Sequence, residues 1–152
     1  MKRLLVVHHT PSPTLQAMLE AVLAGLDQPD LADLDVVTQA ALAAGPMDVL
    51  AADGLVLGTP VNIGYISGAM KHFFDLTYYP CLAQTTGLPF SYYLHGDSNV
   101  AGGTRAMDQI TKGLGWRQVT KPVSCTGPLT SADTNDLREL GATVAAHALD
   151  LL

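Results

Sequence analysis

The stretch that decides the fold reads Leu-Leu-Val-Val-His-His-Thr-Pro-Ser-Pro-Thr and runs from Leu4 to Thr14. Its four apolar residues predict a buried strand, and the polar turn after them leads directly into a helix. Ser12 suits the N-cap of that helix and Pro13 suits its first position, where an N–H is not needed. Such a turn directs free backbone N–H groups and the positive end of the helix dipole toward one point. The stretch therefore predicts an anion site suited to a phosphate.

The rest of the chain continues this alternation of strand and helix. Further apolar runs at 35–38, 54–57, 90–94 and 118–125 predict four more strands, and apolar residues at helical spacing predict the helices between them. This pattern is typical of a parallel sheet covered on both faces. We expect an α/β three-layer sandwich in which five strands have the order 2-1-3-4-5, with Pro122 on an edge strand. Residues 1–152 are expected to form a single domain.

Composition and charge exclude several classes of protein. Hydrophobic residues make up 48% of the chain and charged residues 14%, a balance that argues against disorder. A net charge of −6 with only 8 Lys and Arg argues against nucleic acid or an anionic membrane as a partner. Cys81 and Cys125 form no Cys-x-x-Cys motif, and the histidines lack metal-ligand spacing. We therefore expect a cytoplasmic protein without a metal, a nucleic-acid partner or a membrane partner.

The missing motifs narrow the choice of phosphate ligand. The first turn contains neither Gly-x-Gly-x-x-Gly nor Gly-x-x-x-x-Gly-Lys-Ser/Thr, so the dinucleotide fingerprint and the P-loop are both absent. The acidic residues of a receiver domain are also absent, because His8, His9, Gly58 and Thr59 stand at those places. What remains is a monophosphate held by backbone and hydroxyl groups without a lysine. FMN suits this combination.

Two further loops follow strand carboxyl ends and supply walls for a flat ring. They run from Thr59 to Tyr65, with no helical or strand period, and from His95 to Gly103. In a doubly wound sheet, such loops converge beside the point where the strand order reverses. We expect them to flank the isoalloxazine ring; Tyr65 lies in the first of them.

The chain resembles the flavodoxin-like superfamily, especially its branch of NAD(P)H-dependent FMN and quinone reductases. The resemblance is most specific at Ala52–Pro60, Gly64, Ser67 and the Lys71-x-Phe73-x-Asp75 of the next helix. The first turn is similar to the flavodoxin phosphate pattern Thr-x-Thr-Gly-x-Thr, with Thr10, Ser12 and Pro13 at its first, third and fourth places. It departs from that pattern at Leu15, where the family has threonine.

This resemblance implies an FMN-dependent oxidoreductase that passes electrons from NAD(P)H to a quinone or another acceptor. Two alternatives stay open: a flavodoxin-type electron carrier that docks on a redox protein, and a flavin-free binding module of the same fold. A homodimer with contacts at Tyr78-Tyr79-Pro80 is also implied, and no catalytic acid or base is assigned. The expected cofactor-binding residues are His9, Thr10, Ser12, Pro13, Thr14, Leu15, Thr59, Pro60, Val61, Asn62, Ile63, Gly64, Tyr65, His95, Gly96, Asp97 and Gly102.

Overall fold

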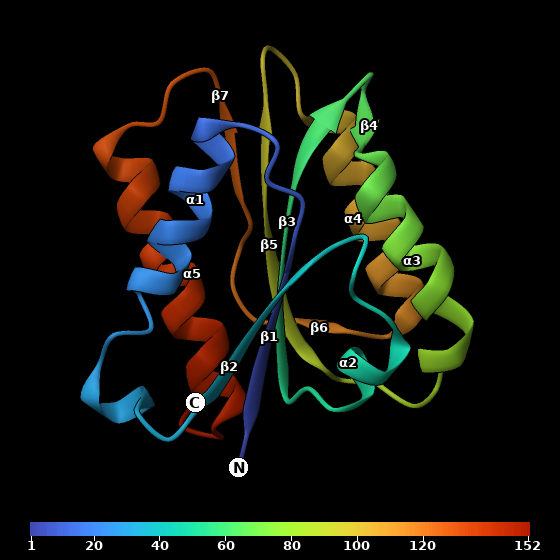
Figure 1. Cartoon of the computed structure of the whole chain (residues 1–152), viewed down its shortest axis with the longest axis vertical. Helices are drawn as coiled ribbons and strands as arrows, with labels where there is room; N and C mark the ends of the chain where they lie inside the picture. Colours follow the sequence, from blue (N-terminus) through green and yellow to red (C-terminus); the bar gives the residue numbers. More distant parts are fainter.

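The structure, a computed structural model, describes all residues from 1 to 152 and has three layers (Figure 1). A central sheet separates α1 and α5 on one face from α2, α3 and α4 on the other (Figure 1). The strands are β1 (Arg3–His8), β2 (Asp35–Ala40), β3 (Gly54–Asn62), β4 (Tyr65–Ile66), β5 (Pro89–Gly96), β6 (Arg117–Gln118) and β7 (Val123–Thr126). The helices are α1 (Pro13–Ala24), the short 3₁₀ helix η1 (Pro29–Leu31), α2 (Pro46–Leu50), α3 (Gly68–Cys81), α4 (Ala101–Leu114) and α5 (Ser131–Ala148). No helix combines the length and the hydropathy that crossing a membrane requires.

The sheet confirms the predicted strand order. Its main path is β2-β1-β3-β5, after which β6 and β7 both pair with β5, and all of these pairings are parallel. The order reverses between β1 and β3, so the carboxyl ends of these two strands open the crevice where doubly wound folds bind ligands. The turn before α1, the end of β3 and the end of β5 all lie at this edge (Figure 1).

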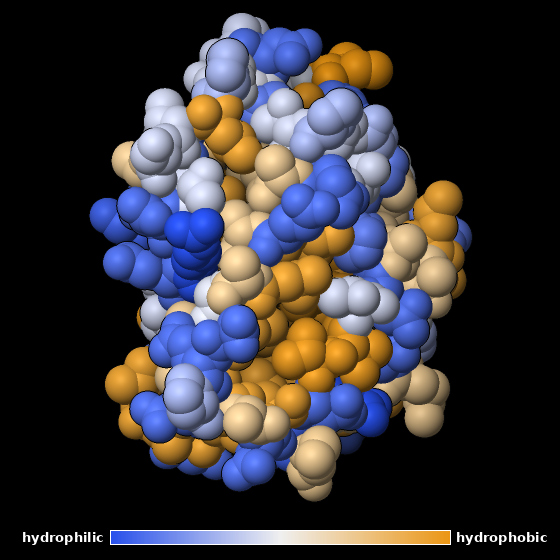
Figure 2. Space-filling model, turned by 60° about the vertical axis from the view of Figure 1, so that its left-hand side comes forward, coloured by the Kyte–Doolittle hydropathy of each residue, from blue (hydrophilic) through white to orange (hydrophobic).

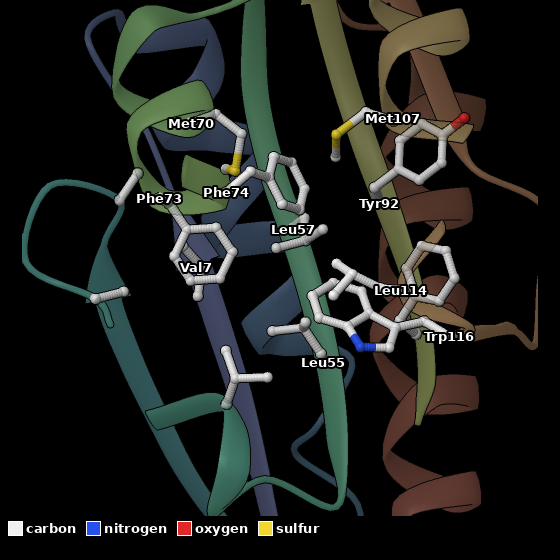
Figure 3. Packing of buried hydrophobic residues seen from close by; sticks show 14 of the residues in the cluster. Val7, Leu55, Leu57, Met70, Phe73, Phe74, Tyr92, Met107, Leu114 and Trp116 are labelled. Carbon is white, nitrogen blue, oxygen red and sulfur yellow. The ribbon is translucent and has the colours of Figure 1, made fainter. Parts of the chain in front are cut away.

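Two hydrophobic cores form because the side chains of a strand alternate between the sheet faces. Leu5 and Val7 of β1 pack in the core under α3 and α4, together with Phe73, Phe74 and Trp116 (Figure 3). The intervening Leu4 and Val6 face α1 and α5 and join the second core. Burying a side chain of this size contributes about 1.5–3 kcal/mol, so the strand Leu4–Val7 anchors both layers.

Two predicted segments differ from the structure. The predicted loop after Pro60 is a β-hairpin, because β3 continues to Asn62 and β4 returns antiparallel to it, with Val61 opposite Ile66. The predicted strand 118–125 is divided into β6 and β7. Between them the N–H of Val119 still donates to the Phe90 carbonyl of β5 at 3.0 Å, and the regular pairing resumes only at Val123. Pro122 has no N–H to donate, and Ser91 of β5 instead hydrogen-bonds through its Oγ to the Thr120 carbonyl at 2.9 Å. The fifth strand therefore exists only as two short pieces.

Candidate functional site

The turn between β1 and α1 presents unused backbone donors. His9 N–H is bound to the Gly58 carbonyl at 2.9 Å, which holds the start of the turn against β3. The N–H groups of Thr10, Ser12 and Thr14 form no hydrogen bond within the protein. Ser12 Oγ accepts the N–H of Leu15 at 3.2 Å and caps α1, as predicted. Three free N–H groups beside a helix N-terminus are donors of the kind that suits an anion.

The hydroxyl groups of this turn have defined partners. Thr10 Oγ1 lies 2.7 Å from His8 Nδ1 and is hydrogen-bonded to it. Burial and the neighbouring His9 both lower the pKa of His8, with burial the larger cause, so His8 is mainly neutral when no anion is near. Binding of an anion near the turn would oppose this shift. His8 is therefore placed to hold the Thr10 side chain in one orientation.

The turn before α1 forms the first wall of the candidate site, and the β3–β4 hairpin forms the second. Its two turn residues, Ile63 and Gly64, both have positive φ angles, 51° and 72°, as a two-residue hairpin turn of type I′ requires. Glycine adopts this conformation readily, whereas a β-branched residue such as Ile63 is strained in it. The Ile63 side chain is also fully exposed. The tip of the hairpin thus carries both backbone strain and an uncovered apolar side chain.

Gly102 holds this hairpin in place. A Cβ atom built on Gly102 would lie only 1.7 Å from the carbonyl oxygen of Gly64, and one on Gly103 would lie 2.5 Å from Val61 Cγ2. Glycines in the first turn of α4 therefore let the helix approach the hairpin backbone closely. The predicted third loop is correspondingly shorter than expected, because α4 already begins at Ala101. Gly102 acts on the site through the hairpin that it supports.

The third wall follows β5. His95 Nε2 donates a hydrogen bond of 2.8 Å to the Gly127 carbonyl, which joins the end of β5 to the segment between β7 and α5. Gly96 is buried, and Asp97 after it is exposed. Asn99 Oδ1 accepts the N–H of Ala101 at 2.9 Å and so fixes the entry to α4.

These three walls enclose a cleft of about 280 Å³. Its lining contains no Lys or Arg, and Asp97 is its one carboxylate. Nine of the expected cofactor-binding residues line it, and Pro11, which was not expected, joins them. The lining residues are Pro11, Ser12, Thr14, Leu15, Pro60, Val61, Asn62, His95, Gly96 and Asp97.

The other expected residues lie around the cleft without lining it. Pro13 is exposed at the first position of α1, and Thr10 is held by His8. Ile63, Gly64 and Tyr65 form the exposed end of the hairpin, and Tyr65 is 42% exposed with no other ring against it.

His9 and Thr59 instead belong to a hydrogen-bonded cluster around Ser67. His9 Nδ1 lies 2.8 Å from Ser67 Oγ, and Thr59 Oγ1 lies 3.0 Å from the same atom. Ser67 Oγ also accepts the N–H of Met70 at 3.2 Å and caps α3. The cluster therefore connects the first turn, β3 and α3 behind the cleft. The sequence offered one signal for it, a serine directly before an amphipathic helix, but it did not indicate a partner 58 residues away.

Tyr93 and Gly58 form a second feature that the sequence did not reveal. The Tyr93 ring crosses Gly58, so that a Cβ on Gly58 would lie 1.9 Å from Tyr93 Cζ. The ring extends toward β1, because His8, Gly58 and Tyr93 occupy one row of the sheet. Its hydroxyl is fully buried and has no hydrogen-bond partner, and burial raises the pKa of Tyr93 far above its usual range. The phenol therefore stays protonated and offers an unused donor.

Together these features fit a mononucleotide phosphate better than a polyphosphate. Free N–H groups and hydroxyls can hold a small anion, but no cation is present to balance the charge of a triphosphate. Residues of the hairpin and residues 95–97 line the same cleft as Ser12 and Thr14. The donor chemistry of the cleft thus fits FMN.

Comparisons with known proteins agree with this chemistry. A model of the family described as NADPH-dependent FMN reductase matches residues 13–126. A flavodoxin from Aquifex aeolicus is 37% identical over 75 residues, which are 49% of this chain and 40% of that protein, so the match spans less than half of the curated relative.

Solved structures show the same fold at low sequence identity. The flavodoxin, WrbA-like protein from Agrobacterium tumefaciens superposes with a TM-score of 0.78 at 19% identity, and the match covers 99% of each chain. Rubredoxin oxygen:oxidoreductase from Desulfovibrio gigas gives a TM-score of 0.82 at 12% identity, covering 99% of this chain and 37% of that one. The fold is thus flavodoxin-like. It corresponds to nearly the whole of the Agrobacterium protein and to 37% of the Desulfovibrio protein.

Proposed function

The chain belongs to the NADPH-dependent FMN reductase family and its cofactor is FMN, and from this premise we propose that it oxidises NAD(P)H and passes the electrons to a quinone-like acceptor. We propose further that residues 1–152 act as one flavin-binding domain. The observation that carries the proposal is the cleft itself. There the turn before α1, with free N–H groups and no charged side chain, meets the two segments that would flank the ring.

We assign the phosphate to the turn before α1. The N–H groups of Thr10, Ser12 and Thr14 and the dipole of α1 would hold it, with the Thr10 hydroxyl oriented by His8. The segments Pro60–Asn62 and His95–Asp97 would flank the ring. When bound, FMN supplies the redox chemistry, and the protein supplies binding, orientation and the electrostatic environment. The carboxylate of Asp97 would make the negative charge of a reduced ring less favourable.

A matched pair of substitutions tests the position of the phosphate. Ser12→Asp and Ser12→Asn both keep a good N-cap, so the helix remains stable and the two variants differ in charge alone. A carboxylate near the phosphate repels it by several kcal/mol at an effective dielectric of about 20, so we expect Ser12→Asp to weaken FMN binding at least about 100-fold. Ser12→Asn should bind within about tenfold of the wild type. Equal affinities for the two variants would place the phosphate elsewhere.

Anaerobic mixing of the FMN-loaded protein with NADPH or NADH tests the activity. Loss of the flavin absorbance band within seconds, followed by its return when a quinone is added, is the expected result. A band that persists with both nucleotides would favour the first alternative, an electron carrier that receives its electrons from a redox protein. A protein that stays colourless after incubation with FMN would instead support a flavin-free module.

A further inference from the structure

The outer edge of β2 is an uncovered row of backbone hydrogen-bonding groups. β2 pairs with β1 alone and lies nearest the viewer in Figure 1, with no helix or loop in front of it. On the inner side, the N–H of Asp35 donates to the Lys2 carbonyl, just before β1, at 2.9 Å, and the N–H of Ala41 donates to the His8 carbonyl of β1 at 2.8 Å. Because successive residues of a strand direct their backbone groups to opposite sides, Val36, Thr38 and Ala40 present theirs outward.

This edge lacks the features that usually prevent strand addition. Natural edge strands are protected by charged residues, by proline or by bulges, and the segment Val36–Ala40 contains none of them. Asp35 is the one charged residue of β2, and Arg3 Nε neutralises it at 2.8 Å. The segment Val36–Ala40 therefore carries no charge that would repel a second strand.

The surface beside the edge is apolar. Val36 and Leu42 are 38% and 67% exposed. Figure 2, turned toward the side that carries α1 and η1, shows hydrophobic side chains gathered in a band across the face. An additional strand beside β2 would therefore gain both backbone hydrogen bonds and apolar contact.

We propose that the partner of this edge is a second copy of the same chain, with its β2 antiparallel to the first across a two-fold axis at Thr38. In this register Thr38 faces Thr38 of the second copy, and Val36 faces Ala40, so a branched residue meets a small one. The outward groups of all three residues then pair with each other, which allows six inter-chain backbone hydrogen bonds. Paired threonines are favourable cross-strand neighbours, and no like charges lie opposite each other.

Thr38→Lys tests the proposal, since it places two ammonium groups directly opposite each other at the axis. Thr38 is exposed on β2 and lies outside the cleft, so FMN affinity serves as a check that the variant is folded. In sedimentation of the FMN-loaded protein from about 1 µM to about 1 mM, we expect a wild-type dimer that dissociates in the range of about 1–100 µM. Thr38→Lys should raise the dissociation constant of the dimer at least about tenfold. Two controls, Thr38→Val on the edge and Gln109→Lys on exposed α4, should leave it unchanged.

Amide hydrogen exchange identifies the interface. In the wild-type dimer the N–H groups of Val36, Thr38 and Ala40 should be protected, and in Thr38→Lys they should exchange freely. Val37 and Gln39 face β1 and should be protected in both proteins. Three results would overturn the proposal: a monomer at about 1 mM, a dimer in which these three amides exchange freely, or an undiminished dimer in Thr38→Lys. The last result would direct attention to α3, where Tyr79 is 79% exposed.

Discussion

Gly102→Ala is the sharpest test of how α4 supports the cleft. The new Cβ would lie 1.7 Å from the Gly64 carbonyl oxygen, whereas Cβ contacts under 3.0 Å are essentially never found, so the two backbones must separate by about 1.3 Å. Alanine gains about 1 kcal/mol over glycine in a helix, but a backbone-to-backbone clash belongs at the upper end of the roughly 1–3 kcal/mol cost of overpacking. We therefore expect a net loss of about 2 kcal/mol.

Thermal unfolding and FMN titration measure the two consequences. A loss of about 2 kcal/mol lowers the Tm by about 4–8 °C for a chain of this size. Since Val61 and Asn62 of the displaced hairpin line the cleft, the Kd for FMN should rise at least about tenfold. Gly68→Ala in α3 is the control, because a Cβ there meets no atom within 4 Å. Its Kd should match the wild type, and its Tm should stay the same or rise, since alanine favours the helix. A Gly102→Ala protein with wild-type Tm and Kd would refute the supporting role of this contact.

Two further substitutions test the buried phenol and the cap of α5. Tyr93→Phe removes a fully buried hydroxyl that has no partner, so the FMN-free protein should gain about 1 kcal/mol and about 2–4 °C in Tm; a lower Tm would show that the hydroxyl is bonded. The backbone N–H of Thr130 lowers the pKa of Asp133 in the folded state, so this carboxylate stabilises the protein above its unfolded pKa, and the stability is lost as the pH falls through the folded value. Asp133→Asn should thus have a Tm about 1–2 °C below that of the wild type near neutral pH, a small difference because the group is largely exposed. The gap should close as the pH falls below the usual range of an aspartate pKa, and a constant gap would exclude the linkage.

The layers and the strand order could be predicted because they depend on patterns that are local in the sequence. Four apolar residues before Ser12-Pro13 are sufficient to identify a strand and the start of a helix, and the structure confirms both. The segment Thr130-x-x-Asp133 likewise has the residue types and spacing of a capping box, and the structure contains that box at the start of α5. Signals of this kind need no knowledge of distant residues.

The site was predicted less completely because its geometry depends on distant contacts. The hairpin after Pro60 was not recognised, since its turn places Ile63 in a conformation that β-branched residues avoid. The approach of Gly102 to Gly64 and the passage of Tyr93 across Gly58 join residues 35 or more positions apart. The spacing of apolar residues along the sequence carries no information about which distant residues come into contact. The sequence could therefore indicate the loops around the cleft and nine of its ten lining residues, but not the contacts that hold those loops in place.

The interruption at Pro122 determines how far this sheet can be extended. At the edge opposite β2, a further strand would meet only β6 and β7, which have two and four residues and are separated by Val119–Pro122. Proline at such an edge removes a donor and discourages strand addition. Growth of the sheet is therefore possible from one side only. Pairing of two β2 strands would use that side in both copies, so the assembly would end at a closed dimer and could not continue into a fibre.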